Sequence, residues 1–160
     1  PHVRLSEGKG SLPWIAVLPG SRNHEIQHIW PLQLETLRRL HTAGVQGEFI
    51  VASLNERFAR LCQEQLTAAD RELPLNFVVG KTSEIIAAAD VALMKSGSVS
   101  LELLARHTPA AVVYHVSRST YLIARTLTRL SSITLPNLLA GKTLMAEFLA
   151  VGQSTQVVQP

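Results

Sequence analysis

Residues 90–104 are Asp-Val-Ala-Leu-Met-Lys-Ser-Gly-Ser-Val-Ser-Leu-Glu-Leu-Leu, an order that indicates a strand, a turn and a helix. The apolar run over 91–94 predicts a short buried strand, and the residues after Ser98 predict a helix. The turn between them, Lys95-Ser96-Gly97-Ser98, leaves backbone N–H groups at the positive end of the helix dipole. This unit therefore predicts an anion site, where Gly97 would let a ligand approach the backbone closely.

Glu102 lies one turn into that helix, among apolar residues. Its carboxylate could accept hydrogen bonds from the hydroxyls of a sugar while phosphates bind the N–H groups. A simpler interpretation is a serine-capped helix in which Glu102 pairs with Arg106 at i,i+4. This stretch alone leaves both interpretations open.

Apolar runs and amphipathic segments alternate along the rest of the chain. The runs predict strands at 14–18, 48–52, 75–79 and 110–116, with a possible last strand at 132–135. Helices are predicted at 23–29, 31–43, 55–69, 83–89 and 119–130, with a closing helix at 144–150; Pro31 suits the first turn of the second of these. The alternation indicates an α/β fold, a Rossmann-like parallel sheet with helices on both faces. Residues 1–12 are expected to be a linker and residues 13–160 one domain.

Composition sets outer bounds on the class of protein. Apolar residues make up 46% of the 160 residues and charged residues 17%, which fits a globular domain and excludes a disordered chain. No apolar run approaches the length of a membrane span. The lone Cys62 cannot form an internal disulfide, as expected in a reducing compartment. The chain starts without Met, so we expect it to be part of a longer protein.

The charges are unevenly distributed. Residues 103–160 carry five basic side chains against a single acidic one, Glu147, which suggests an anionic partner for this part. Arg125 and Arg129 of the 119–130 helix, with Arg118 just before it, would share one face, where they would meet anionic lipid head groups or an acidic substrate or simply be solvated. Nucleic acid is not expected as a partner, because aromatic residues are only 5% and do not alternate with basic ones.

Loops that follow parallel strands form the ligand site in such folds. Gly20-Ser21-Arg22 would supply N–H donors, a hydroxyl and a guanidinium that can hold phosphate in a bidentate manner. Gly80 begins the corresponding loop after the third strand. Gly20-Ser21-Arg22 is neither a Walker sequence nor a G-x-G-x-x-G motif, so neither an NTPase nor a dinucleotide-binding protein is indicated. The alternative is a glycine turn with a solvated arginine.

Two other motifs are ambiguous. His24-Glu25-Ile26-Gln27-His28 matches H-E-x-x-H, which in a zinc hydrolase supplies two ligands and a base. Pro31 follows it closely and no third ligand is evident, so a polar helix start is favoured. Asn137, within Leu135-Pro-Asn-Leu-Leu-Ala-Gly141, could bind a ligand or fix its own loop by an Asx-turn.

Four segments together resemble the lipid-A-disaccharide synthase family, in the order of that family and across about residues 13–150. They are Leu18-Pro-Gly-Ser-Arg22 with Glu25-Ile26, Ser96-Gly-Ser-Val-Ser-Leu-Glu102, Ala111-Val-Val-Tyr114, and Leu135-Pro-Asn-Leu-Leu-Ala-Gly141 with Glu147-Phe-Leu149. The Leu-Pro-Asn-Leu-Leu-Ala-Gly element is the most specific. The chain departs from the family at Ser98, where threonine is usual, and at Lys95, which often is a smaller residue.

The resemblance implies a two-domain GT-B glycosyltransferase whose C-terminal, UDP-sugar-binding half is this chain. That enzyme transfers 2,3-diacylglucosamine from its UDP derivative to diacylglucosamine 1-phosphate, in lipid A biosynthesis at the cytoplasmic face of the inner membrane of Gram-negative bacteria. By this resemblance Arg22 and the Ser96-Gly97-Ser98 turn would hold the diphosphate, Glu102 the ribose, and Asn137 would complete the site. The whole expected binding set is Gly20, Ser21, Arg22, Gly80, Lys95, Ser96, Gly97, Ser98, Glu102 and Asn137.

The resemblance also implies what lies outside the chain: the N-terminal acceptor domain, with its catalytic base, and the last C-terminal helices. We therefore expect an inverting transferase, without metal or cofactor, whose isolated donor half binds but is inactive. The alternatives are another UDP-sugar enzyme of the same fold, such as a UDP-N-acetylglucosamine epimerase or a peptidoglycan glycosyltransferase, and a non-catalytic nucleotide-binding module.

Overall fold

The computed structural model describes residues 12–117, 134–151 and 157–158. The predicted linker, apart from Leu12, and the predicted 119–130 helix with its arginines lie outside these ranges.

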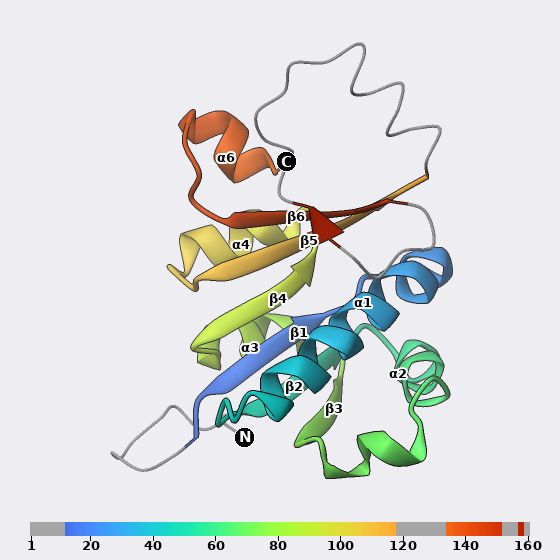
Figure 1. Ribbon diagram of the computed structural model, residues 1–160. Helices are drawn as coiled ribbons and strands as arrows, with labels where there is room; N and C mark the ends of the chain where they lie inside the picture. The colour runs from blue at the N-terminus through green and yellow to red at the C-terminus, as the bar shows by residue number, and fades with distance from the viewer. Residues whose placement is uncertain (1–11, 118–133, 152–156, 159–160) are drawn as a thin grey trace.

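A seven-stranded sheet runs through the molecule (Figure 1) in the order β3-β2-β1-β4-β5-β6-β7. The first six strands are parallel and β7 is antiparallel to β6. The strands are β1 (Trp14–Leu18), β2 (Glu48–Ser53), β3 (Leu75–Val79), β4 (Val91–Lys95), β5 (Ala110–Val116), β6 (Ala146–Val151) and β7 (Val157–Val158). The predicted Rossmann-like parallel sheet is confirmed.

The order in which successive strands are added to the sheet reverses between β1 and β4. It moves from β1 outward to β2 and β3, then crosses back to β4, which pairs with β1 from Ile15↔Val91 to Leu18↔Met94. Ligands of such sheets bind beyond the carboxyl ends of the strands at this reversal point. The fold thus marks the loops after β1 and β4 as the place to look for a site.

Helices cover both faces of the sheet because the strands are apolar on both sides. Residues Ile15 and Val17 of β1 pack into one core with α1 (Asn23–Thr42) and α2 (Glu56–Gln63). Ala16 and Leu18 point the other way, into a core with α3 (Thr82–Ala88) and α4 (Val99–Ala105). The short α6 (Leu135–Ala140) contacts α4, and a 3-10 helix η1 (Ala68–Glu72) precedes β3.

The two helices predicted on either side of Pro31 are one continuous helix, α1. Proline inside a helix removes a hydrogen bond and costs about 3 kcal/mol. The face of α1 that contacts the sheet includes Ile29, Trp30 and Leu34, all buried, and Trp30 also donates a hydrogen bond to the Cys62 carbonyl at 2.9 Å. Tertiary packing on both sides of Pro31 therefore outweighs the local preference for a break.

The predictions for three other segments were wrong. The closing helix predicted at 144–150 is strand β6, whose six residues pair with β5 from Ala111↔Ala146 to Val116↔Val151. The available edge of β5 decides this conformation against local propensity. Leu135 does not end a strand but begins α6, where the Thr134 side chain caps the helix. The helix predicted over 55–69 ends at Gln63.

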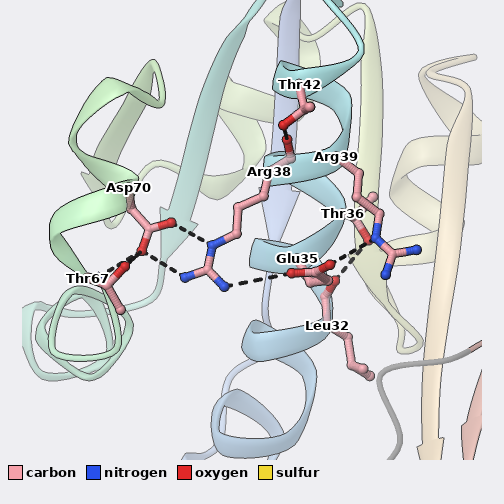
Figure 2. A network of polar contacts seen from close by, with 8 residues as sticks. All are labelled: Leu32, Glu35, Thr36, Arg38, Arg39, Thr42, Thr67 and Asp70. Atoms are coloured by element: carbon pink, nitrogen blue, oxygen red, sulfur yellow. Dashed lines mark hydrogen bonds and ion pairs between the residues drawn. The ribbon is translucent and has the colours of Figure 1, made fainter.

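The buried carboxylate of Asp70 links η1 to α1 through hydrogen bonds (Figure 2). Arg38 donates to both oxygens of Asp70, at 2.6 and 2.8 Å, and the backbone N–H and hydroxyl of Thr67 donate to the same carboxylate. The Arg38 hydrogen bonds hold the pKa of Asp70 well below its usual range, although burial opposes this. Glu35 pairs with Arg38 and Arg39 on the more exposed side of the network.

We predict that Asp70→Asn destabilises the fold by about 1.5–3 kcal/mol, the value of hydrogen bonds to a charged group. Because the Asp70 pKa is depressed by folding, this contribution is complete above the ordinary aspartate pKa and is lost as the pH falls below it. Urea unfolding at pH 7 and at pH 3 measures both effects. The control is Glu35→Gln, which removes exposed ion pairs and should cost less than about 0.5 kcal/mol. Equal stability of Asp70→Asn and wild type at pH 7 would contradict the prediction.

Candidate functional site

A cleft of about 520 Å³ opens where the sheet order reverses. The loop after β1 and the β4–α4 turn line the cleft, together with Leu54, which follows β2, and with Thr82 and Ser83, which begin α3. Eight of the ten residues predicted as the binding set meet here: Gly20, Ser21, Arg22, Lys95, Ser96, Gly97, Ser98 and Glu102. Residues that are 75 positions apart in the sequence are thus brought together by the pairing of β1 with β4.

Glu25, in the first turn of α1, holds the two main loops of the cleft together. Its buried carboxylate accepts the backbone N–H of Ser21 and the ammonium of Lys95, both at 3.0 Å, and lies 3.6 Å from the Arg22 guanidinium. The sequence pattern did not indicate this role for Glu25. No local pattern could have found it, because its partner Lys95 is 70 residues away.

The environment of Glu25 keeps its carboxylate ionised. Burial raises the pKa of this group, but the hydrogen bonds from Ser21 and Lys95, together with the charges of Lys95 and Arg22, outweigh burial and lower the pKa overall. Arg22, by contrast, is 74% exposed. The cleft is therefore lined by the exposed guanidinium of Arg22 and by the ion pair between Lys95 and Glu25.

Gly20 is required by the close approach of Glu25. Its φ of +123° lies in a region that other residues rarely adopt. A Cβ on this residue would lie 2.8 Å from Oε2 of Glu25 and 2.9 Å from its Cβ. Gly97 in the opposite loop has open space at the same position.

Helix α4, which follows the β4 turn, agrees in part with each of the two interpretations of Glu102, as a ligand-binding carboxylate and as the partner of Arg106. Ser98 makes no side-chain cap; instead the Ser100 hydroxyl donates to the Gly97 carbonyl at 2.7 Å. Glu102 pairs with Arg106 at 3.1 Å, as the simpler interpretation expected, and it also lines the cleft with about a third of its side chain exposed. Its carboxylate is therefore accessible to a ligand as well as paired.

Gly80 and Asn137 do not line the cleft. Gly80 follows β3 with a φ of +70°, and its N–H donates to the Ser53 carbonyl. Asn137 is buried: its amide donates to the Met145 carbonyl and to Glu147, and its oxygen accepts the N–H groups of Leu144 and Met145, all between 2.7 and 2.9 Å. Of the two roles left open for Asn137, the structure shows the loop-fixing one, although through tertiary bonds rather than an Asx-turn.

The two histidines of the H-E-x-x-H motif do not meet a third ligand. Nδ1 of His28 lies 2.7 Å from the His24 carbonyl, and the His28 ring stacks on His115 with 4.6 Å between ring centroids. Over residues 12–117 and the other described segments, no three His, Cys, Asp or Glu side chains form a group suited to a metal ion. Glu25 is occupied by Ser21 and Lys95 instead of acting as a base.

A further cavity of about 450 Å³ lies on the α1 side of β4, β5 and β6 and has almost entirely apolar walls, among them Leu32, Val91 and Phe148. The guanidinium that lines it, that of Arg39, is already paired with Glu35 at 2.9 Å, so the polar cleft is the better candidate. None of the helices in the described ranges has both the length and the apolar character needed to span a bilayer.

Comparison with known proteins agrees with the geometry. The family model for lipid-A-disaccharide synthetase matches residues 8–159. The lipid-A-disaccharide synthases of Anaeromyxobacter dehalogenans, Azotobacter vinelandii and Aliivibrio fischeri are 37%, 36% and 36% identical over 84%, 84% and 85% of this chain. The matched segment spans 35%, 36% and 36% of those relatives, about a third of their length.

A solved structure shares the fold at low identity. The E. coli ADP-heptose LPS heptosyltransferase II superposes with a TM-score of 0.56 at 14% identity, over 91% of this chain and 41% of that one. This likeness shows the fold alone and agrees with the GT-B architecture predicted from the sequence.

We predict that Gly20→Ala destabilises the protein by about 2–3 kcal/mol, because the new methyl group meets Glu25 and the backbone is strained. Gly97→Ala is the matched control, since its methyl group meets nothing; its stability should change by less than about 1 kcal/mol. Urea midpoints compared at constant m-value measure both. If the two variants unfold at the same midpoint, Glu25 does not constrain the β1 loop.

Proposed function

Because this chain belongs to the lipid-A-disaccharide synthetase family, we propose that it is the donor-binding half of a glycosyltransferase. The enzyme would transfer 2,3-diacylglucosamine from UDP to diacylglucosamine 1-phosphate. The observation that carries the proposal is the cleft at the reversal point of the sheet, which gathers eight residues suited to a nucleotide diphosphate. The family match favours this function over an epimerase or a peptidoglycan glycosyltransferase.

UDP fits the chemistry of the cleft in three parts. The exposed Arg22 guanidinium and the Ser96-Gly97-Ser98 turn would hold the diphosphate, which Arg binds in a bidentate manner. Lys95 would add a second positive charge. Glu102 would accept hydrogen bonds from the ribose hydroxyls. These donors would stabilise the charge that grows on UDP as it leaves, which is the usual source of electrostatic catalysis.

The base that deprotonates the acceptor hydroxyl would come from the acceptor domain. Of the carboxylates that line the cleft, Glu25 has a lowered pKa and two hydrogen-bonded partners, so it is a weak base. Glu102 is paired with Arg106 and assigned to the ribose. Direct displacement with a base on the opposite side of the sugar would invert the anomeric centre. The acceptor domain, the cytoplasmic face of the inner membrane and its anionic surface are the partners that this function implies.

Arg22→Ala should weaken UDP binding by about 1.5–3 kcal/mol, the value of charge-assisted hydrogen bonds. UMP should bind less tightly than UDP and lack most of this sensitivity. Arg39→Ala is the matched control, because its side chain is 73% exposed, compared with 74% for Arg22, and it also pairs with a glutamate on α1, but it lies away from the cleft. Calorimetry that gives the same UDP affinity for Arg22→Ala and wild type would rule out this role.

The 160 residues alone should bind UDP but not transfer sugar. Lacking contacts from the acceptor side, they should bind with a Kd on the order of 10⁻⁴ to 10⁻³ M. Glu102→Gln should cost roughly 1–2 kcal/mol of this affinity without changing the fold. Ligand-observed NMR with UDP measures the binding, and a radiolabelled transfer assay with lipid acceptor measures turnover. Disaccharide formation above background by these residues would contradict the assignment of the base to the other half.

A further inference from the structure

Arg106, directly after α4, holds the cleft residue that the proposed function assigns to the ribose. Its Nε donates to Oε1 of Glu102 at 3.1 Å, across one turn of the helix. Glu102 lines the cleft, whereas Arg106 does not. The guanidinium can therefore hold the carboxylate without taking the place of a ligand in the cleft.

The end of α4 fixes the backbone from which Arg106 extends. The helix ends in a Schellman motif, in which the N–H groups of His107 and Thr108 donate to carbonyls of the last turn at 3.0 Å. His107 adopts the left-handed conformation that this motif requires, with a φ of +57°. The hydroxyl of the buried Thr108 donates to the Ile86 carbonyl of α3 at 3.3 Å. The backbone next to Arg106 is thus bonded to α3 as well as to α4.

The carboxylate of Glu102 keeps free acceptor positions beside its bond to Arg106. Oε2 accepts no hydrogen bond from the described residues, and Oε1 has a second lone pair. The 2′- and 3′-hydroxyls of a ribose are two adjacent donors, which match the two oxygens of one carboxylate. The bond to Arg106 therefore restricts the carboxylate but leaves the positions that a ribose needs.

A glutamate that is held before the ligand arrives should bind more tightly than a free one. An unpaired glutamate on a helix samples several rotamers, and fixing it on binding costs free energy. The bond from Arg106 reduces this cost, because part of the restriction already exists in the free protein. Partly exposed i,i+4 pairs add little to the stability of the fold. The larger effect of Arg106 is thus expected in ligand binding.

We propose that Arg106 is a positioning residue, which orients the Glu102 carboxylate towards the ribose hydroxyls of a bound nucleotide diphosphate. The inference rests on the proposed function, because Arg106 can act in this way only if Glu102 contacts the ribose. The positive charge of Arg106 would also attract any nucleotide diphosphate, with or without these hydroxyls. Its positioning role is therefore measured by the ratio of the affinities for UDP and for 2′,3′-dideoxy-UDP.

An equivalent pair on α1 provides the control. Arg39 donates from Nε to Oε1 of Glu35 at 2.9 Å, again at i,i+4, but neither residue lines the cleft. If such pairs serve only to stabilise their helices, the two arginines should behave alike. If Arg106 positions Glu102 for a ligand, only Arg106 should affect the affinity ratio.

The test measures the Kd of UDP and of 2′,3′-dideoxy-UDP for the 160-residue protein by NMR titration. Arg106→Met keeps an aliphatic side chain and a good helix former but removes the donor. It should lower the preference for UDP over the dideoxy compound by about 2–4-fold, the effect of fixing one long side chain on binding. Arg39→Met should leave the preference unchanged. In a Glu102→Ala background Arg106→Met should not lower it further, because both residues act through one carboxylate.

The outcomes separate this inference from the proposed function. If Glu102→Ala lowers the preference for UDP but Arg106→Met does not, the positioning role is overturned and the ribose contact of Glu102 stands. A preference that rises in Arg106→Met, or that falls equally in the Glu102→Ala background or in Arg39→Met, would also overturn the positioning role. If Glu102→Ala leaves the preference unchanged, or if wild type binds neither compound, the proposed nucleotide contacts fail and the inference fails with them.

Discussion

The ionised carboxylate of Glu25 is the interaction on which the geometry of the site depends. It is buried against the sheet, yet it keeps its charge because Ser21, Lys95 and Arg22 surround it with donors and positive charge. Burying a charge is tolerated only when it is paired and hydrogen-bonded in this way. The consequence is that the loop after β1 and the turn after β4 cannot move independently, since one carboxylate holds both.

Several other features follow from that carboxylate. Gly20 has no alternative at its position, because the side chain of Glu25 occupies the space where a Cβ would lie. Lys95 is held by Glu25 at 3.0 Å and lines the cleft. Arg22, which is only weakly engaged at 3.6 Å, stays exposed at the rim, where a ligand can reach it.

Most of this fold could be predicted from the sequence. Its strands are buried on both faces of the sheet, and each such strand appears in the sequence as a continuous apolar run. The sequence also predicted eight of the residues that meet in the cleft, since loops after parallel strands share one edge of the sheet. The errors came where distant contacts decide the outcome. Pro31 sits within a helix whose packing holds it, and residues 146–151 form a strand because β5 offers a partner. The bond between Glu25 and Lys95 had no sequence signal for the same reason.

Lys95 connects the ion pair to the chemistry proposed for the cleft. An ammonium group has three donors, and in this structure one of them is directed to Glu25. A diphosphate can therefore bind the remaining donors without breaking the pair. The Glu25 charge also limits the affinity that Lys95 can give to a diphosphate, because it neutralises part of the attraction. In the proposed transferase such a limit would favour the release of UDP after the sugar has been transferred. Arg22 lies farther from the same carboxylate, at 3.6 Å, and is 74% exposed, so it would supply binding, while the Lys95–Glu25 pair would supply position.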